Sequence, residues 1–118
     1  MTASNVLDGR SMANTLEELP IYQKVCEFWD AVTAILTTPA LRRDRDLHNQ
    51  IERAVNSVDA NMKEGFEQPT DASFGNFVFI AKGSVAEVVT RARQAKKRGY
   101  IDDKQLATMS NSASPSGK

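Results

Sequence analysis

Residues 56–91 read NSVDANMKEGFEQPTDASFGNFVFIAKGSVAEVVTR and contain two segments with helical periodicity. The two segments meet at Pro69-Thr70-Asp71, which is a turn sequence. Polar residues recur three or four positions apart in each segment, so they share one face of each helix. The stretch therefore predicts a helical hairpin with a polar seam. The seam residues are Ser57, Asn61 and Glu64 on the first helix and Ser84, Glu87 and Arg91 on the second.

Apolar residues recur every three or four positions along most of the chain, as is typical of amphipathic helices. The pattern predicts three long helices, over residues 20–37, 40 or 44–64, and 72–98. A fourth helix of two or three turns is expected after Asp102, which can form a capping box with Gln105. The predicted fold is all-α, an up-down antiparallel helical bundle of three long helices plus a short or truncated fourth.

Length and composition are those of one globular domain, with 118 residues, 41% hydrophobic and 25% charged. We expect a helical bundle domain over residues 16–108, between a disordered N-terminal tail at 1–15 and a disordered C-terminal tail at 109–118. No apolar run reaches the roughly 20 residues that span a bilayer. The N-terminus also lacks a signal pattern. We therefore expect a cytoplasmic protein without membrane contact.

Three glycines carry specific expectations. Gly65 follows Glu64 and is expected at the left-handed position that ends the second long helix. Gly75 and Gly83 each cost about 1 kcal/mol relative to alanine inside a helix. This cost favours a close approach of a neighbouring helix at both positions.

Catalytic and metal-binding patterns are absent from the sequence. The chain has one histidine, His48, and one cysteine, Cys26, whereas a zinc site needs about four ligands. A nucleophilic triad would depend on His48 alone, which is expected to be a surface or helix-packing residue. Cys26 lies in an apolar helical pattern, which favours buried packing over a reactive thiol. We expect a non-enzymatic protein without metal or cofactor.

Basic residues gather toward the end of the third long helix. The whole chain has a formal net charge of zero, which argues against a strongly basic nucleic-acid binder but allows a local basic patch. Two interpretations remain open for this cluster. It can bind a polyanion, most strongly in a ring-shaped oligomer, or it can compensate the helix dipole while Arg91 pairs with Glu87. The candidate nucleic-acid-binding residues are Lys82, Arg91, Arg93, Lys96, Lys97 and Arg98.

The apolar faces of the first and third helices are wider than one neighbouring helix requires. The first helix carries two adjacent apolar stripes, at 21, 25, 28, 32, 35 and at 22, 26, 29, 36. Phe79, Ile80 and Val89 lie outside the core face of the third helix. Either the first helix is central in the bundle, or one of its stripes faces another subunit or a protein partner. The surplus residues of the third helix again indicate a second contact surface.

The sequence around the polar seam resembles that of the four-helix-bundle family encoded by intervening sequences in bacterial 23S rRNA genes. The family hallmark is a Ser…Asn-x-x-Glu-Gly segment that ends the second helix and an Ala-x-Gly-Ser-x-x-Glu segment within the third. The opening Leu19-Pro20-Ile21-Tyr22-Gln23-Lys24 and the closing Gly99-Tyr100-Ile101 also fit, so the resemblance covers about residues 19–103. The matching residues are Ser57, Asn61, Glu64, Gly65 and Phe66, then Ala81, Gly83, Ser84 and Glu87.

The resemblance implies a bundle that assembles as a homo-oligomer, typically a pentameric ring. A related group comprises accessory proteins of diversity-generating retroelements, which bind a reverse transcriptase and its RNA. The resemblance thus implies an association with RNA or another nucleic acid, or alternatively a protein-binding accessory scaffold. Family members normally have a long fourth helix, and a short one is expected here. The polar seam is interpreted as a hydrogen-bonded contact that fixes helix register, in preference to a ligand site.

Overall fold

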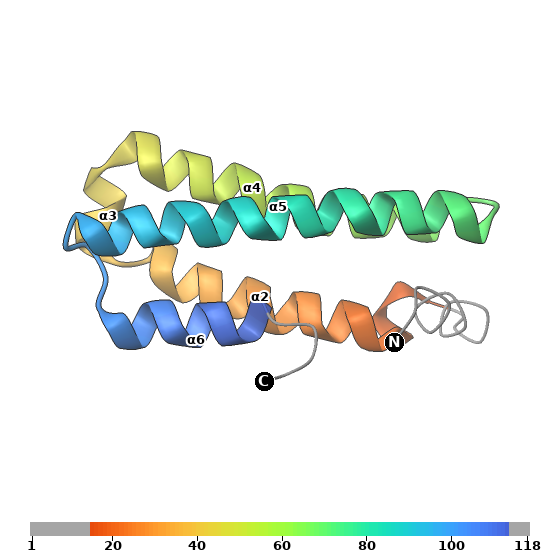
Figure 1. Ribbon diagram of the computed structural model, residues 1–118, viewed down its shortest axis with the longest axis horizontal. Coiled ribbons are helices and arrows are strands. Elements are labelled where there is room, and N and C mark those ends of the chain that lie inside the picture. Colours follow the sequence, from red (N-terminus) through yellow and green to blue (C-terminus); the bar gives the residue numbers. More distant parts are fainter. Residues whose placement is uncertain (1–14, 114–118) are drawn as a thin grey trace.

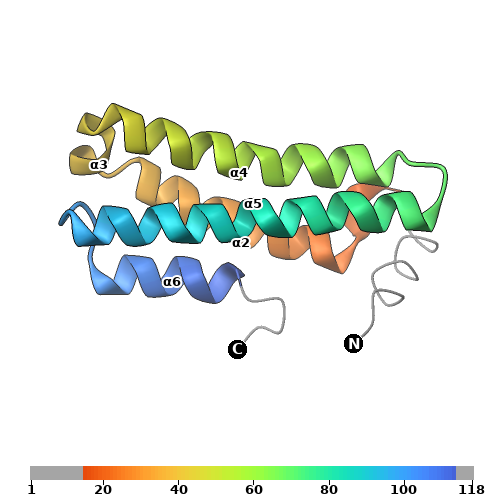
Figure 2. The same cartoon turned by 45° about the horizontal axis from the view of Figure 1, so that its top comes forward.

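The computed structural model describes residues 15–113, and over that range the chain forms helices and no strand. The longer helices run alternately up and down along a common axis (Figure 1 and Figure 2). The predicted all-α bundle is therefore confirmed. Of the tails expected at 1–15 and 109–118, residues 1–14 and 114–118 lie outside the described residues. The elements are η1 (Leu16–Glu18), α2 (Pro20–Leu36), α3 (Pro39–Arg43), α4 (Arg45–Phe66), α5 (Asp71–Lys97) and α6 (Asp103–Ala113).

The second long helix of the prediction is divided into α3 and α4 by Asp44. This residue has backbone angles φ −86° and ψ 80°, outside the helical region. Its side chain accepts a hydrogen bond from the backbone N of Leu47 at 3.2 Å. Aspartate is a preferred N-cap because its carboxylate satisfies a free N–H of the first turn. The two expected starts, Ala40 and Asp44, thus mark two separate helices.

Gly65 does not end α4 in a left-handed conformation, so that prediction is wrong. It lies inside the helix, and among the described residues only Gly99 has a positive φ, of 79°. A Cβ atom at Gly65 would lie 2.7 Å from Phe77 Cβ and 3.0 Å from Phe74 Cδ1. Glycine is needed here because α5 approaches α4 closely.

Gly75 and Gly83 show the opposite situation, and the close approach predicted for them is also wrong. A Cβ atom at either position would meet nothing within 4 Å. Both glycines lie on α5 away from the neighbouring helices of the described chain. The contact that the sequence pattern assigned to them is made by Gly65 instead.

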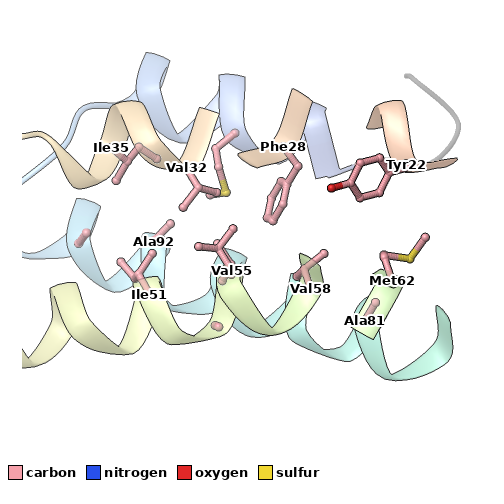
Figure 3. Packing of buried hydrophobic residues seen from close by; sticks show 14 of the residues in the cluster. Tyr22, Phe28, Val32, Ile35, Ile51, Val55, Val58, Met62, Ala81 and Ala92 are labelled. Atoms are coloured by element: carbon pink, nitrogen blue, oxygen red, sulfur yellow. The ribbon is translucent and has the colours of Figure 1, made fainter. Parts of the chain in front are cut away.

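The core forms where a ladder of side chains from α2 faces one from α4 (Figure 3). Phe28, Val32 and Ile35 on α2 lie opposite residues 51, 55 and 58 of α4, and all six side chains are buried. Helix α5 adds the small side chains of Ala81 and Ala92 to this part of the core, and the larger Phe74, Val78 and Val88 are also buried. Each large side chain buried in this way contributes about 1.5–3 kcal/mol.

The first apolar stripe of α2 faces this core, whereas the second lies at its edge. Tyr22 is buried, and its hydroxyl donates a 2.7 Å hydrogen bond to Asp59 on α4. Burial and this hydrogen bond raise the pKa of Tyr22. Cys26, one turn further, is exposed. The prediction that Cys26 is buried is therefore wrong, and the residue lines an open hollow with Tyr22 and with Asp59 of α4.

Helix α6 extends the bundle beyond the boundary expected at residue 108. It has 11 residues, which are three turns, and ends at Ala113. Met109 is fully buried, with 0% of its surface exposed. Helix α6 packs between α2 and α5 and stops near the middle of the bundle (Figure 1 and Figure 2). The fourth helix is therefore short, as expected, but it contributes to the core through a residue assigned to the tail.

Helix α5 is unusually apolar on its outward side. Residues 72–81 contain no charged side chain, and Phe79 and Ile80 are 78% and 49% exposed. By length and composition alone α5 could cross a membrane, and only 22% of its most apolar window is buried within the single chain. One such helix carries no membrane assignment, and the exposed part of the window includes the outward side that bears Phe79 and Ile80.

Candidate nucleic-acid interface

Three of the six candidate nucleic-acid-binding residues pair with carboxylates. Arg98 Nη1 lies 2.7 Å from Asp44 Oδ2, and Lys96 Nζ lies 3.0 Å from Asp103 Oδ1. Arg91 Nε lies 3.5 Å from Glu87 Oε2, in a contact without hydrogen-bond geometry. Arg91 Nη1 also lies 3.4 Å from the Gln94 side-chain oxygen. For these three residues the geometry fits the second interpretation, in which the basic side chains pair within the protein and do not bind a polyanion.

The other three candidates, Lys82, Arg93 and Lys97, are exposed and have no carboxylate within 4.0 Å among residues 15–113. They lie along one side of α5, because 11 residues are close to three helical turns and four residues are close to one. Lys82 is nevertheless about 16 Å along the helix from Arg93. The structure therefore places Arg93 and Lys97 together and Lys82 apart.

Asp44 joins the α3–α4 junction to the residues that follow α5. Its carboxylate accepts hydrogen bonds from Arg98 Nη1 at 2.7 Å, from the Tyr100 hydroxyl at 2.8 Å and from the backbone of Leu47 at 3.2 Å. These hydrogen bonds, the one from Tyr100 first, hold the pKa of Asp44 below its usual value. The same contact raises the pKa of Tyr100. The α3–α4 junction is thereby fixed to the loop between α5 and α6.

Arg43 and Arg45 come to the same end of the bundle through this junction. Both are exposed, and they line an open hollow with Asp44, Asp46 and Tyr100. In the sequence they alternate with Asp44 and Asp46, a mixture of charges that is typical of a solvated face. The Asp44 carboxylate is instead engaged by Arg98 and Tyr100. We define the basic end as Arg43, Arg45, Arg93 and Lys97.

No local sequence signal identifies Arg43 and Arg45 as part of this site. The pairing that brings them to α5 joins Asp44 to Arg98 and Tyr100, which are 54 and 56 residues away. An aspartate that precedes a helical pattern predicts an N-cap. It does not predict which distant side chains share its carboxylate.

The polar seam is a contact of three side chains between α4 and α5. The hydroxyls of Ser57 and Ser84 lie 2.9 Å apart, and Asn61 Nδ2 donates to Ser57 O at 2.8 Å and to Ser57 Oγ at 3.1 Å. Three other residues expected in the seam lie outside this contact: Glu64 and Glu87 are exposed, and Arg91 contacts Glu87 and Gln94 of its own helix. The geometry of Ser57, Asn61 and Ser84 is that of a hydrogen-bonded register contact.

A family model for the 23S rRNA-intervening sequence protein matches residues 17–118, which include the seam and the basic end. The chain belongs to this family. Comparisons with curated proteins and with solved structures give no match. Membership of the 23S rRNA-intervening sequence family confirms the resemblance seen in the seam residues.

In this 23S rRNA-intervening sequence protein the histidine and the cysteine occupy separate places. His48 Nε2 lies 3.2 Å from the backbone oxygen of Leu36, at the last turn of α2. Partial desolvation and the charge of Asp30 raise the pKa of the exposed Cys26 thiol, which reduces the fraction of reactive thiolate. Within residues 15–113, no three His, Cys, Asp or Glu side chains are grouped so that they could hold a metal ion.

Proposed function

We propose that this 23S rRNA-intervening sequence protein is a non-enzymatic, oligomeric helical bundle that associates with RNA through its basic end. The arrangement around Asp44 carries the proposal. Its carboxylate accepts hydrogen bonds from Arg98 and Tyr100. Arg43 and Arg45 therefore stand on either side of it as exposed cations.

The chemistry of the basic end suits a phosphate backbone. Its two α5 residues, Arg93 and Lys97, are one helical turn apart and have no carboxylate partner among the described residues. Arginine presents a planar fork of donors that matches phosphate, and lysine presents a compact charge. Exposed cations of this kind bind RNA mainly by releasing counterions. In a homo-oligomer the same four cations would recur once in each subunit.

The test is RNA binding as a function of salt. The variant carries Arg93→Glu and Lys97→Glu, and the charge-matched control carries Lys24→Glu and Lys82→Glu, on another part of the bundle. We expect the first variant to bind a mixed RNA pool more weakly than the unmodified protein. The fall of log K with log salt should also become less steep, by about 2 in the slope. Fluorescence anisotropy at several salt concentrations measures both quantities.

Three results would contradict the RNA proposal. The first is the absence of RNA binding at low salt. The second is binding that does not depend on salt. The third is an equal loss in the two charge-reversed variants, since such a loss would report total charge and not the basic end.

A second candidate function is that of a protein-binding accessory scaffold. It is favoured by the exposed Phe79 and Ile80 on α5, next to a stretch without charged residues. Large exposed apolar side chains in one place mark interaction surfaces. If the protein forms an oligomer in which Phe79 stays accessible, the surface is available to another protein. If Phe79 becomes inaccessible on assembly, the surface belongs to the homo-oligomer.

A further inference from the structure

An apolar groove continues the line of α6 beyond the end of that helix. Helices α2 and α5 extend past Ala113 (Figure 1 and Figure 2), and between them lies a groove of about 330 Å³. Its walls include Ile21 and Val25 from α2 and Val85 from α5, and its closed end is formed by Ser112 and Ala113. We call it the α2/α5 groove.

The shape of the groove is that of an unfilled helix position in a bundle. Its floor includes Val58 and Met62 of α4, which are core residues, and α6 already occupies the same position along the other half of α2 and α5. Apart from two lysines, Ser112 is the polar side chain that lines it. An extended peptide would leave its backbone groups without partners here, whereas a helix satisfies its own. The groove therefore favours a helical occupant.

The charges around the groove select the kind of helix. Lys24 lies on the α2 wall and Lys82 on the α5 wall, and no carboxylate is among the described residues that line the groove. Lys82 is exposed without a carboxylate partner in residues 15–113, and Lys24 has a single loose contact of 3.7 Å to Glu27. A helix that fits between these walls carries an apolar stripe flanked on both sides by acidic residues.

The chain itself offers no segment with that pattern. Residues 114–118 read SPSGK, in which Pro115 disfavours a helix at the preceding residue and no acid is present. Residues 1–14 contain one acid, Asp8, followed directly by Gly9. The exposed apolar side chain of a second copy, Phe79, is followed one turn later by Lys82, which the groove's own lysines would repel.

We propose that the α2/α5 groove binds an amphipathic helix of a partner protein, with apolar side chains on the floor and carboxylates beside Lys24 and Lys82. This proposal uses different residues from the basic end, so the two can fail separately. Burial of apolar area along the groove supplies affinity, and the two lysines set the preference for acidic flanks.

The test uses two synthetic 14-residue helical peptides with leucines on one face. One peptide has glutamates on both flanks of the leucine stripe, and the other has lysines at the same positions. A bimane label at Ala86→Cys, in a Cys26→Ala background, reports on the groove wall. We expect the glutamate peptide to bind saturably and to shift the bimane emission to the blue, while the lysine peptide binds more weakly.

Charge reversal then separates this site from other apolar surfaces. Lys24→Glu with Lys82→Glu is expected to weaken the glutamate peptide about tenfold and to reverse the preference toward the lysine peptide. Arg93→Glu with Lys97→Glu is the charge-matched control and is expected to leave both affinities unchanged. All four substitutions are at exposed positions, so the fold is retained.

Three results would overturn the proposal. One is the absence of peptide binding, or binding that ignores the charge reversal. Another is a label that is already blue-shifted without peptide at every protein concentration, which would mean that residues 1–14 or 114–118 of the same chain fill the groove. The third is a blue shift that grows with protein concentration alone, which would assign the groove to a second copy of the chain.

Discussion

At the scale of single residues, Gly65 sets the distance between α4 and α5. Replacing it with alanine places a Cβ atom 2.7 Å from Phe77 Cβ, an atom fixed by its own backbone. Such overpacking typically costs about 1–3 kcal/mol, partly offset by up to about 1 kcal/mol of helix propensity. We expect Gly65→Ala to lower the free energy of unfolding by about 1–2 kcal/mol, measured by urea denaturation.

Gly83→Ala is the matched control, since a Cβ atom there meets nothing within 4 Å. It is expected to stabilise the protein by up to about 1 kcal/mol through helix propensity. Equal effects of the two alanines would show that the contact of Gly65 with α5 carries no energetic weight.

The same glycines show how far the sequence predicts structure at this scale. A glycine after Glu64, near the end of a helical pattern, has the same local signature whether it caps the helix or admits a neighbour. The contact that decides between them involves Phe77, 12 residues away on another helix. Cys26 was misplaced for a related reason: periodicity shows which residues share a face, but not whether a neighbouring helix covers that face.

Asp44 links stability to pH. Its carboxylate has a pKa below the usual 3.8 in the folded protein, so the charged form is stabilised by folding. That contribution is present above pH about 4 and is lost as the pH falls through the lowered pKa. We expect Asp44→Asn to lower the melting temperature at neutral pH and to flatten its decline in acid.

Asp46→Asn is the control variant for the acid range. Asp46 is a nearby exposed carboxylate, and its hydrogen bond comes from Gln50 of the same helix. Thermal unfolding from pH 7 downward checks both variants. An acid decline in Asp44→Asn as steep as that of the unmodified protein would contradict the assignment.

At the scale of elements, the packing of α6 against the bundle depends mainly on one buried side chain. Met109 is fully buried, while the helix around it is short and polar. Removing a buried methionine side chain costs about 2–5 kcal/mol. We expect Met109→Ala to destabilise the bundle within this range and to increase hydrogen exchange in α6 first. The exposed neighbour Thr108→Ala is expected to change stability little, and a similar loss in both would argue against α6 as a core element.

Element boundaries were predictable where the signal is local. Pro20 and Pro39 mark helix starts, Thr70 caps α5 by accepting a hydrogen bond from Ser73, and Asp102 with Gln105 forms the expected box before α6. The end of α6 was predicted too early, because Met109 is followed by serine and asparagine and its burial depends on α2 and α5. Half of the basic end was missed for the same reason, since Arg43 and Arg45 join it only through tertiary contacts.

At the scale of the whole molecule, the outward side of α5 is the surface on which assembly is expected. Phe79 is 78% exposed in the single chain. Burial of such a side chain between subunits would contribute about 1.5–3 kcal/mol for each copy. We expect Phe79→Lys to shift the mass measured by light scattering toward the monomer while the circular dichroism of the helices is retained.

Thr90→Lys introduces the same charge at another exposed position of α5 and is expected to leave the mass unchanged. An unmodified protein that is already monomeric would remove the assembly proposal. A mass that both lysines reduce equally would attribute the effect to charge repulsion and not to the loss of the aromatic contact.

The hydrogen bonds of Asp44 also bear on the order of folding. The carboxylate joins residues 54 and 56 positions apart, so its contacts close only after α3, α4, α5 and the following loop have all formed. A chain still emerging from the ribosome has Arg43 and Arg45 long before it has Arg98 and Tyr100. The complete basic end, with all four cations held together, is thus expected only after Arg98 and Tyr100 have been synthesised and have packed against Asp44.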